Sequence, residues 1–135
     1  MREILFRGKC VQNGDWIFGW YSKACYGSWP LRDAIADIDK AEDGCLGFEE
    51  VDPNTVGQFT GLIDKNGTKI FEGDIVRLDI AGIIFNAVCK FHSGSFGLVW
   101  HYMGADRWQA FTSICHVEYE VIGNVHDNPE LTEDK

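Results

Sequence analysis

The chain has 135 residues, of which 45% are hydrophobic and 13% aromatic, and its formal net charge is −9 at pH 7. This length and apolar content predict one folded domain, residues 1–135, with a core of its own. Because affinity for nucleic acids depends chiefly on Lys and Arg, the acidic balance argues against a protein whose main partner is a phosphate backbone.

The cysteines are five, an odd number, and lie far apart in the sequence. They are Cys10, Cys25, Cys45, Cys89 and Cys115. No Cys-x-x-Cys pair exists to hold zinc or form a redox motif. No apolar run has the length of a membrane span or the basic flank of a signal peptide. We therefore expect a cytosolic protein with reduced, mostly buried thiols.

The first predicted elements are two strands, near residues 3–10 and 16–21. Side chains alternate along the first, and Asn13-Gly14-Asp15 indicates a hairpin turn after it. In the second, Trp16, Phe18 and Trp20 alternate with equally apolar neighbours, so we expect both of its faces to be covered.

Residues 23–48 allow two interpretations. Apolar residues from Leu31 to Ala41 fall at helical spacing, and Pro30 suits a first helical position. The alternative is two short strands, near residues 33–38 and 46–51, joined by an acidic turn at 39–44. We prefer the strands, because a helix would carry acids toward its C-terminal end, against its dipole.

Acidic residues are concentrated in the same part of the chain. Residues 32–52 hold eight carboxylates and two basic side chains, a net charge of −6 (two minus eight). We interpret residues 23–52 as an irregular acidic insertion that forms a solvated connection.

The clearest fold prediction comes from residues 58–78, which contain two reversals. Asp64-Lys65-Asn66-Gly67 is an Asx-rich hairpin turn, and Glu72-Gly73-Asp74 starts a new strand at an angle. A calcium loop would need further oxygen ligands at fixed spacing, so turn chemistry is the preferred interpretation. Before this stretch, residues 52–55 form a turn capped by Asp52.

The remaining chain predicts strands near residues 75–80, 83–91, 96–101, 108–114 and 117–121, with a loop at 103–107. Asn128 and Pro129 open a short turn in a frayed tail, residues 129–135. Short strands and turns without crossover helices predict a mainly β fold, a small antiparallel barrel or sandwich, in which an SH3-like barrel is one form.

Several segments together resemble the YopX family of phage and prophage proteins. They are the N-terminal strand, Val51-Asp52-Pro53-Asn54-Thr55, the Asp64–Gly67 and Glu72–Asp74 turns, and the tail from Glu120 through Val-Ile-Gly-Asn to Asn128-Pro129-Glu130-Leu131. The resemblance spans nearly the whole chain except residues 23–48. It implies a mainly β protein encoded by bacterial phages or integrated elements and implies no established activity. Together with the reduced thiols, this leads us to expect the cytoplasm of a bacterial host cell.

Catalytic chemistry finds little support in the sequence. Glu118 and Glu120 share a strand face about 7 Å apart, but no nucleophile motif, phosphate loop or zinc motif accompanies them. His92 and His101 flank one predicted hairpin, where Asp106 would complete a metal site. Cys115 and His116 are adjacent on a strand and so point to opposite faces. We expect no catalytic, cofactor or metal residues.

Exposed aromatic side chains are the stronger indication of function. The aromatic residues exceed what one small core needs, and Tyr26 and Trp29 are the candidate partner-binding residues because they lie in the irregular segment. The first hypothesis is a non-enzymatic protein-binding module, acting on another protein or by self-association.

Two other functions remain as alternatives. One is nucleic-acid binding by a small β barrel, if Arg2, Arg7, Lys9, Arg77 and Lys90 gather on one sheet face. The other is an enzyme acting on a nucleotide or sugar, which would need an apolar cleft with buried acids.

Overall fold

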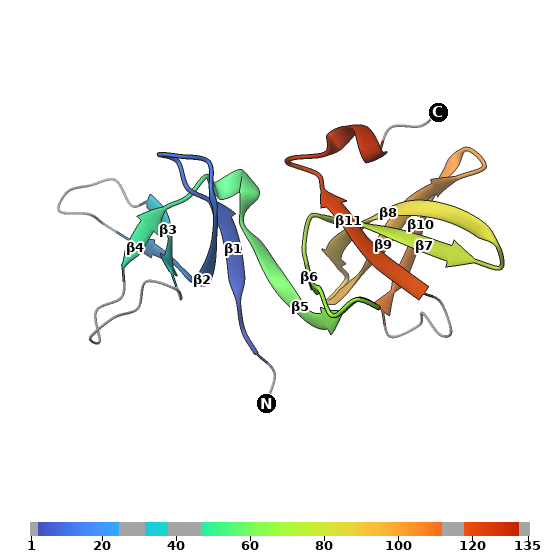
Figure 1. Ribbon diagram of the computed structural model, residues 1–135, viewed down its shortest axis with the longest axis horizontal. Helices are drawn as coiled ribbons and strands as arrows, with labels where there is room; N and C mark the ends of the chain where they lie inside the picture. Colours follow the sequence, from blue (N-terminus) through green and yellow to red (C-terminus); the bar gives the residue numbers. More distant parts are fainter. Residues whose placement is uncertain (1–2, 25–31, 38–46, 112–117, 133–135) are drawn as a thin grey trace. The chain divides into compact units, whose positions relative to one another are not determined.

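The computed structural model describes residues 3–24, 32–37, 47–111 and 118–132, and antiparallel β-strands make up most of them (Figure 1). The predicted mainly β, antiparallel class is confirmed. The strands are β1 (Phe6–Lys9), β2 (Trp16–Ala24), β3 (Arg32–Asp37), β4 (Phe48–Glu50), β5 (Gly57–Ile63), β6 (Lys69–Phe71), β7 (Asp74–Ile80), β8 (Ile83–His92), β9 (Ser95–Tyr102), β10 (Ala105–Ala110) and β11 (Glu118–Asn124). Two short 3-10 turns are η2 (Pro53–Thr55) and η4 (Pro129–Thr132).

The strands form two sheets, and the contacts divide the chain into two compact units, Met1–Phe59 and Thr60–Lys135. One sheet has the order β4-β3-β2-β1-β5-β6 and the other β10-β9-β8-β7-β11. Strand β5 contains the boundary between the units. Over the described strands neither sheet closes into a barrel, so the barrel form of the prediction is wrong.

The first unit has its own core on one face of β1 to β4. Its buried residues are Cys10, Ile17, Ile35 and Val51. A bridge between Cys10 and Val51 returns the chain after β4 to β1, and the backbone N–H of Asp52 donates to the Lys9 carbonyl at 2.9 Å. The sheet therefore curls around this core.

Within residues 23–52 the described parts are regular strands. Residues 32–37 form β3, so the helical interpretation is wrong there and the preferred strands are confirmed. Asp37 is buried, and Asp33 accepts a hydrogen bond from the Tyr21 hydroxyl. The Asp33 hydrogen bond, with burial and the Asp33 charge, raises the pKa of Tyr21. The expected solvated connection is therefore wrong at these two acids.

The second unit has a separate core beneath β7, β8 and β9. Its buried residues are Ile70, Val76, Leu78, Ala87, Cys89 and Leu98. Side chains alternate along β7: Val76 and Leu78 point into the core, whereas Arg77 between them and Asp79 after them are exposed. The predicted loop at residues 103–107 is wrong, because Met103 and Gly104 alone form the turn and β10 begins at Ala105.

The Asx turn predicted at Asp64 is confirmed and also ties the second unit together. Asp64 accepts hydrogen bonds from the backbone N–H groups of Asn66 at 2.8 Å, Thr68 at 2.9 Å and Val121 at 2.9 Å. Burial of Asp64 raises its pKa, but these three donors and the nearby Lys65 charge outweigh burial and hold the pKa below its usual value. Val121 lies beside an irregularity in β11, and Asp64 satisfies its amide there.

The predicted cap at residue 52 is confirmed as well. The Asp52 side chain accepts from the backbone N–H of Asn54 at 3.0 Å and opens η2. At the other end of the chain, the Asn128 carbonyl accepts from the Leu131 N–H at 3.1 Å, while its side-chain oxygen accepts from the Asn124 N–H at 3.3 Å.

Candidate protein-binding surface

The two residues predicted to bind a partner, Tyr26 and Trp29, lie outside the described residues. Other aromatic side chains do lie outside the two cores, as the prediction of more aromatic residues than one core needs requires. Trp20, Phe48, Phe91 and Tyr102 are exposed. The prediction that both faces of residues 16–21 are covered is therefore wrong at Trp20, which is 46% exposed.

Three side chains in the first unit form a row across neighbouring strands, which we call the aromatic row: Trp20, Ala36 and Phe48. Trp20 on β2 is opposite Ala36 on β3, which is opposite Phe48 on β4. Directly opposed residues point to the same face of a sheet. The core residues Ile17 and Ile35 point to the other face, since they have the opposite parity. The row is thus an outward face with a fully buried alanine between two aromatics that are 46% and 40% exposed.

Two acidic residues follow Phe48 at the end of the row. Phe48 is followed by Glu49 and Glu50, and Glu50 forms an ion pair with Arg32 at 2.9 Å. A pocket of about 350 Å³ opens here, and its lining includes Cys10, Phe48 and these acids. Phe48 is not among the partner-binding residues predicted from the sequence, because its exposure depends on β4 lying at the end of its sheet. Its local signal is the pair of acids, Glu49 and Glu50, that directly follows it.

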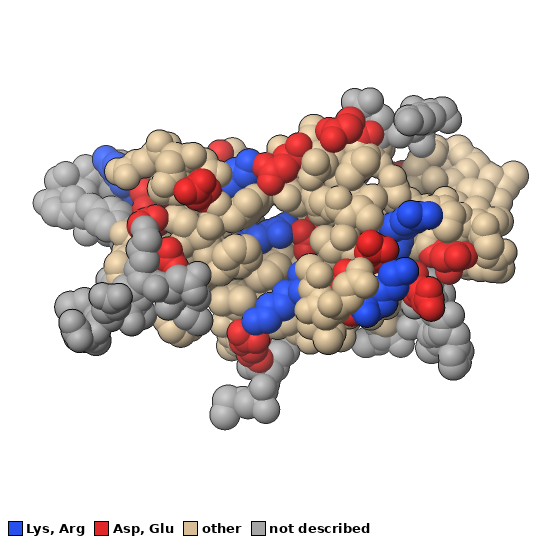
Figure 2. Space-filling model, in the orientation of Figure 1, with Lys and Arg blue, Asp and Glu red and all other residues tan. Residues whose placement is uncertain are grey.

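Basic residues proposed for nucleic-acid binding are divided between the units. Arg7 and Lys9 lie on β1, and both approach the Trp16 ring, at 4.6 Å and 5.5 Å from its centroid. Arg7 is only 7% exposed, so its guanidinium is held in cation–π contact and is not offered to a phosphate. Arg77 and Lys90 belong to β7 and β8 of the second unit, and Arg2 lies outside the described residues. On the face drawn in Figure 2, basic and acidic side chains are interspersed.

The two histidines considered for a metal site, His92 and His101, do not lie together. His92 stacks edge-on against Trp108 at 5.1 Å, whereas His101 contacts Asp106 at 3.1 Å. The two histidines stand near opposite ends of β9, because His92 is opposite Ser95 and His101 lies six residues further along. No group of three metal-binding side chains occurs among the residues that the structure describes. Cys115 and His116 lie outside them.

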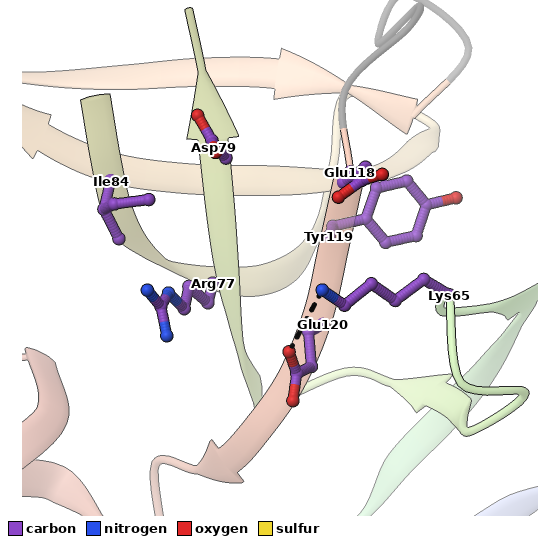
Figure 3. A pocket seen from close by; sticks show the side chains of 7 residues that line it. All are labelled: Lys65, Arg77, Asp79, Ile84, Glu118, Tyr119 and Glu120. Atoms are coloured by element: carbon purple, nitrogen blue, oxygen red, sulfur yellow. Dashed lines mark ion pairs between the residues drawn. The ribbon is translucent and has the colours of Figure 1, made fainter. Parts of the chain in front are cut away.

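Glu118 and Glu120 line a shallow polar pocket of about 160 Å³ on the outer face of β7 and β11 (Figure 3). Lys65 reaches across β11 to Glu120, with 3.5 Å between Nζ and Oε2. Arg77 is the cross-strand neighbour of Glu120, and Asp79 is that of Glu118. In Figure 3 these side chains lie on an open sheet face, and Arg77 points toward Ile84 rather than toward Glu120. Paired charges on an open face favour a solvated polar surface.

Comparisons with known proteins identify a family and do not provide an activity. A family model described as YopX protein matches residues 6–133. No curated protein matches the chain significantly. Among solved structures, the chain is similar to protein EF1440 from Enterococcus faecalis, with 27% sequence identity and a TM-score of 0.48, over 98% of this chain and 100% of that one. In the described part of the chain, no helix is long and apolar enough to cross a membrane.

Proposed function

The chain belongs to the YopX family, and we propose that it is a non-enzymatic module that binds another protein through the aromatic row of its first unit. The observation that carries this proposal is the alignment of Trp20 and Phe48 on one outward face, across a buried alanine. Exposed Trp side chains at the centre of a small patch are the typical anchors of protein interfaces.

The charge of the sequence segment that contains β3 and β4 suggests the chemistry of the partner. Residues 32–52 carry a net charge of −6, from two basic and eight acidic side chains. Complementary charge steers association and excludes partners of the same sign. We therefore expect a partner surface with an apolar centre and a basic rim.

The resemblance to phage and prophage proteins and the thiols suggest the setting. Cys10 and Cys89 are both buried and not disulfide-bonded, which fits a reducing compartment. We place the protein in the cytoplasm of a bacterial cell, as an accessory protein of a phage or integrated element. The nucleic-acid alternative has less support, because Arg7 is engaged with Trp16.

The experiment compares partners recovered with tagged wild-type protein and three variants from lysate of the source cells. We expect a basic protein to be recovered with the wild type and to fall roughly tenfold with Trp20→Ser or Phe48→Ser, as hot-spot truncation does. The matched control is Phe91→Ser, which removes an aromatic that is 54% exposed in the second unit. Recovery should also decrease as salt is raised.

The proposal fails if no recovered protein depends on Trp20 or Phe48 while circular dichroism shows that the variants are folded. Self-association is measured in the same samples by light scattering. A dimer that dissociates in Trp20→Ser and persists in Phe91→Ser would identify a second copy of the chain as the partner.

A further inference from the structure

Strand β4 is the end strand of its sheet, and its outward backbone groups can be identified from the ladder with β3. The Val51 N–H donates to the Asp33 carbonyl, and the Asp37 N–H donates to the Gly47 carbonyl. In an antiparallel ladder, bonded and non-bonded residue pairs alternate. Glu49 therefore directs its N–H and C=O toward β3, whereas Phe48 and Glu50 direct theirs away from the sheet.

One of these outward groups already has a partner. The Glu50 carbonyl accepts from the Val11 N–H at 3.1 Å. For the Phe48 N–H and C=O and the Glu50 N–H, no hydrogen bond is found within the described part of the chain. Three groups on one edge that lack a partner among the described residues form a template for another strand.

Natural sheet edges are usually protected from self-pairing by short length, charged side chains, proline or a bulge. Strand β4 is short and carries two acids, which oppose pairing with a second copy, but it has no lysine, proline or bulge, and an aromatic side chain, 40% exposed, stands directly on the edge. The pocket of about 350 Å³ beside it adds room for a side chain of an incoming strand. The edge thus offers backbone groups, an apolar contact and a side-chain pocket together.

Charge decides which occupant this edge fits. Glu49 and Glu50 lie on the edge, within a segment of net charge −6, from two basic and eight acidic side chains. A second copy pairing edge to edge would bring these acids against their own equivalents, and like charges directly opposite destabilise a sheet. A basic segment would be attracted instead.

We propose that β4 accepts an extended, basic segment of another protein as an added strand. The segment pairs its backbone with the Phe48 N–H and C=O and the Glu50 N–H, as in other cases of β-strand addition. Because strand side chains alternate, one residue packs on Phe48 and its neighbour faces Glu49 on the other side of the sheet. This inference specifies how the proposed partner is bound and rests on the proposed function.

The test uses peptides selected from a displayed library of random peptides against the full-length chain. We expect recovered peptides to alternate basic residues with β-branched or aromatic ones, and their affinity to fall as salt is raised. Phe48→Pro removes the edge N–H, and proline is tolerated where the N–H of an edge strand faces outward. Phe48→Ala removes the ring and keeps the N–H, so it is the matched control.

Affinities are measured by fluorescence anisotropy, with circular dichroism to check folding. Phe48→Pro should bind roughly tenfold more weakly than Phe48→Ala, because it removes a donor as well as the ring. A second measurement needs no variant: peptides methylated on alternate backbone nitrogens should lose binding to the wild type in one methylation register and keep it in the other.

Equal affinity of Phe48→Pro and Phe48→Ala, together with binding in both methylation registers, overturns strand addition. If Trp20→Ser still weakens the same peptides, the proposed function survives and the peptides bind to the aromatic face. If selection recovers no basic peptides, strand addition by a basic segment is wrong. The lysate experiment then judges the proposed function separately.

Discussion

Gly19 is required by a close backbone approach rather than by a turn. A Cβ atom at this position would lie 1.7 Å from the Ala36 carbonyl oxygen on β3. That distance is far inside van der Waals contact, and the obstacle is backbone that belongs to the sheet itself. The strand that carries Trp20 can therefore lie against β3 only because residue 19 has no side chain.

We expect Gly19→Ala to destabilise the protein by about 3 kcal/mol, the upper end of the range for overpacked interiors. Urea unfolding followed by tryptophan fluorescence measures the change. Gly47→Ala is the control, because a Cβ there meets nothing within 4 Å, and we expect its free energy of unfolding to stay within about 0.5 kcal/mol of wild type. Equal stability of the two variants would contradict the close approach.

Asp64 shows how one carboxylate joins a turn to a distant strand. Its folded pKa is held below the usual value by three backbone donors. We expect Asp64→Asn to lower stability by about 2 kcal/mol at neutral pH, because hydrogen bonds to a charged acceptor are lost.

The pH dependence of that difference has a definite sign. A lowered folded pKa means that the charged form stabilises the fold above the unfolded pKa of about 3.9. This stability is lost as pH falls through the folded pKa, so wild type and Asp64→Asn should converge toward acid. Urea midpoints between about pH 7 and about pH 3 test this, with the exposed Glu130→Gln as control. If the difference in stability between wild type and Asp64→Asn did not change with pH, the loss would come from the shape of the side chain and not from its charge.

At the scale of elements, three hairpins of the second unit turn through the same geometry. Ala81, Ser93 and Met103 each have a φ near 50° (52°, 51° and 53°) and each precedes a glycine, also at positive φ. Two positive φ values define the tight turn that suits twisted strands, for which Asn-Gly is the best sequence. Met103 is the outlier, since it is bulky and 80% exposed.

We therefore expect Met103→Asn to stabilise the protein by about 1 kcal/mol, because asparagine tolerates the left-handed region better than other side chains. Met103→Leu, which keeps the apolar chain and the strain, should leave the thermal midpoint unchanged. An unchanged midpoint for Met103→Asn as well would mean that the turn is not strained.

These turns also show what sequence can and cannot predict. Asn66-Gly67 and Gly73 mark their reversals because few residues adopt positive φ, and both reversals were predicted. Met103 gave no such mark, so a two-residue turn was expected to be a loop. Phe48 was not predicted for a different reason. Its exposure depends on β4 being the last strand of its sheet, and the alternation of apolar and polar residues within a strand does not reveal the order of the strands.

On the scale of the whole molecule, each unit has a core of its own, one built around Ile35 and the other around Leu78. The composition predicted enough apolar residues for a core. It could not predict that they form two separate cores, because that depends on which strands pack against each other. The continuous strand β5 contains the boundary between the units. The prediction of a single domain can therefore be tested by asking whether the two cores unfold in one cooperative transition.

We expect one unfolding transition, which Ile35→Ala and Leu78→Ala each shift by about 3 kcal/mol, as cavities in packed cores do. Differential scanning calorimetry and circular dichroism measure it. Ile63→Ala truncates an exposed residue of β5 and is the control. Two transitions, each moved by only one of the core variants, would show that the units unfold separately.

Among the described residues, the first core contains the buried thiol of Cys10 and the second that of Cys89. Alkylating reagents reach Cys89 only when its surroundings open, so its rate of modification reports local opening, whereas the rate at Cys10 also depends on access through the pocket beside Phe48. With the other three cysteines replaced by serine, mass-resolved labelling would follow one site in each unit in one sample. The wild-type chain already holds these two probes, and no foreign label needs to be introduced.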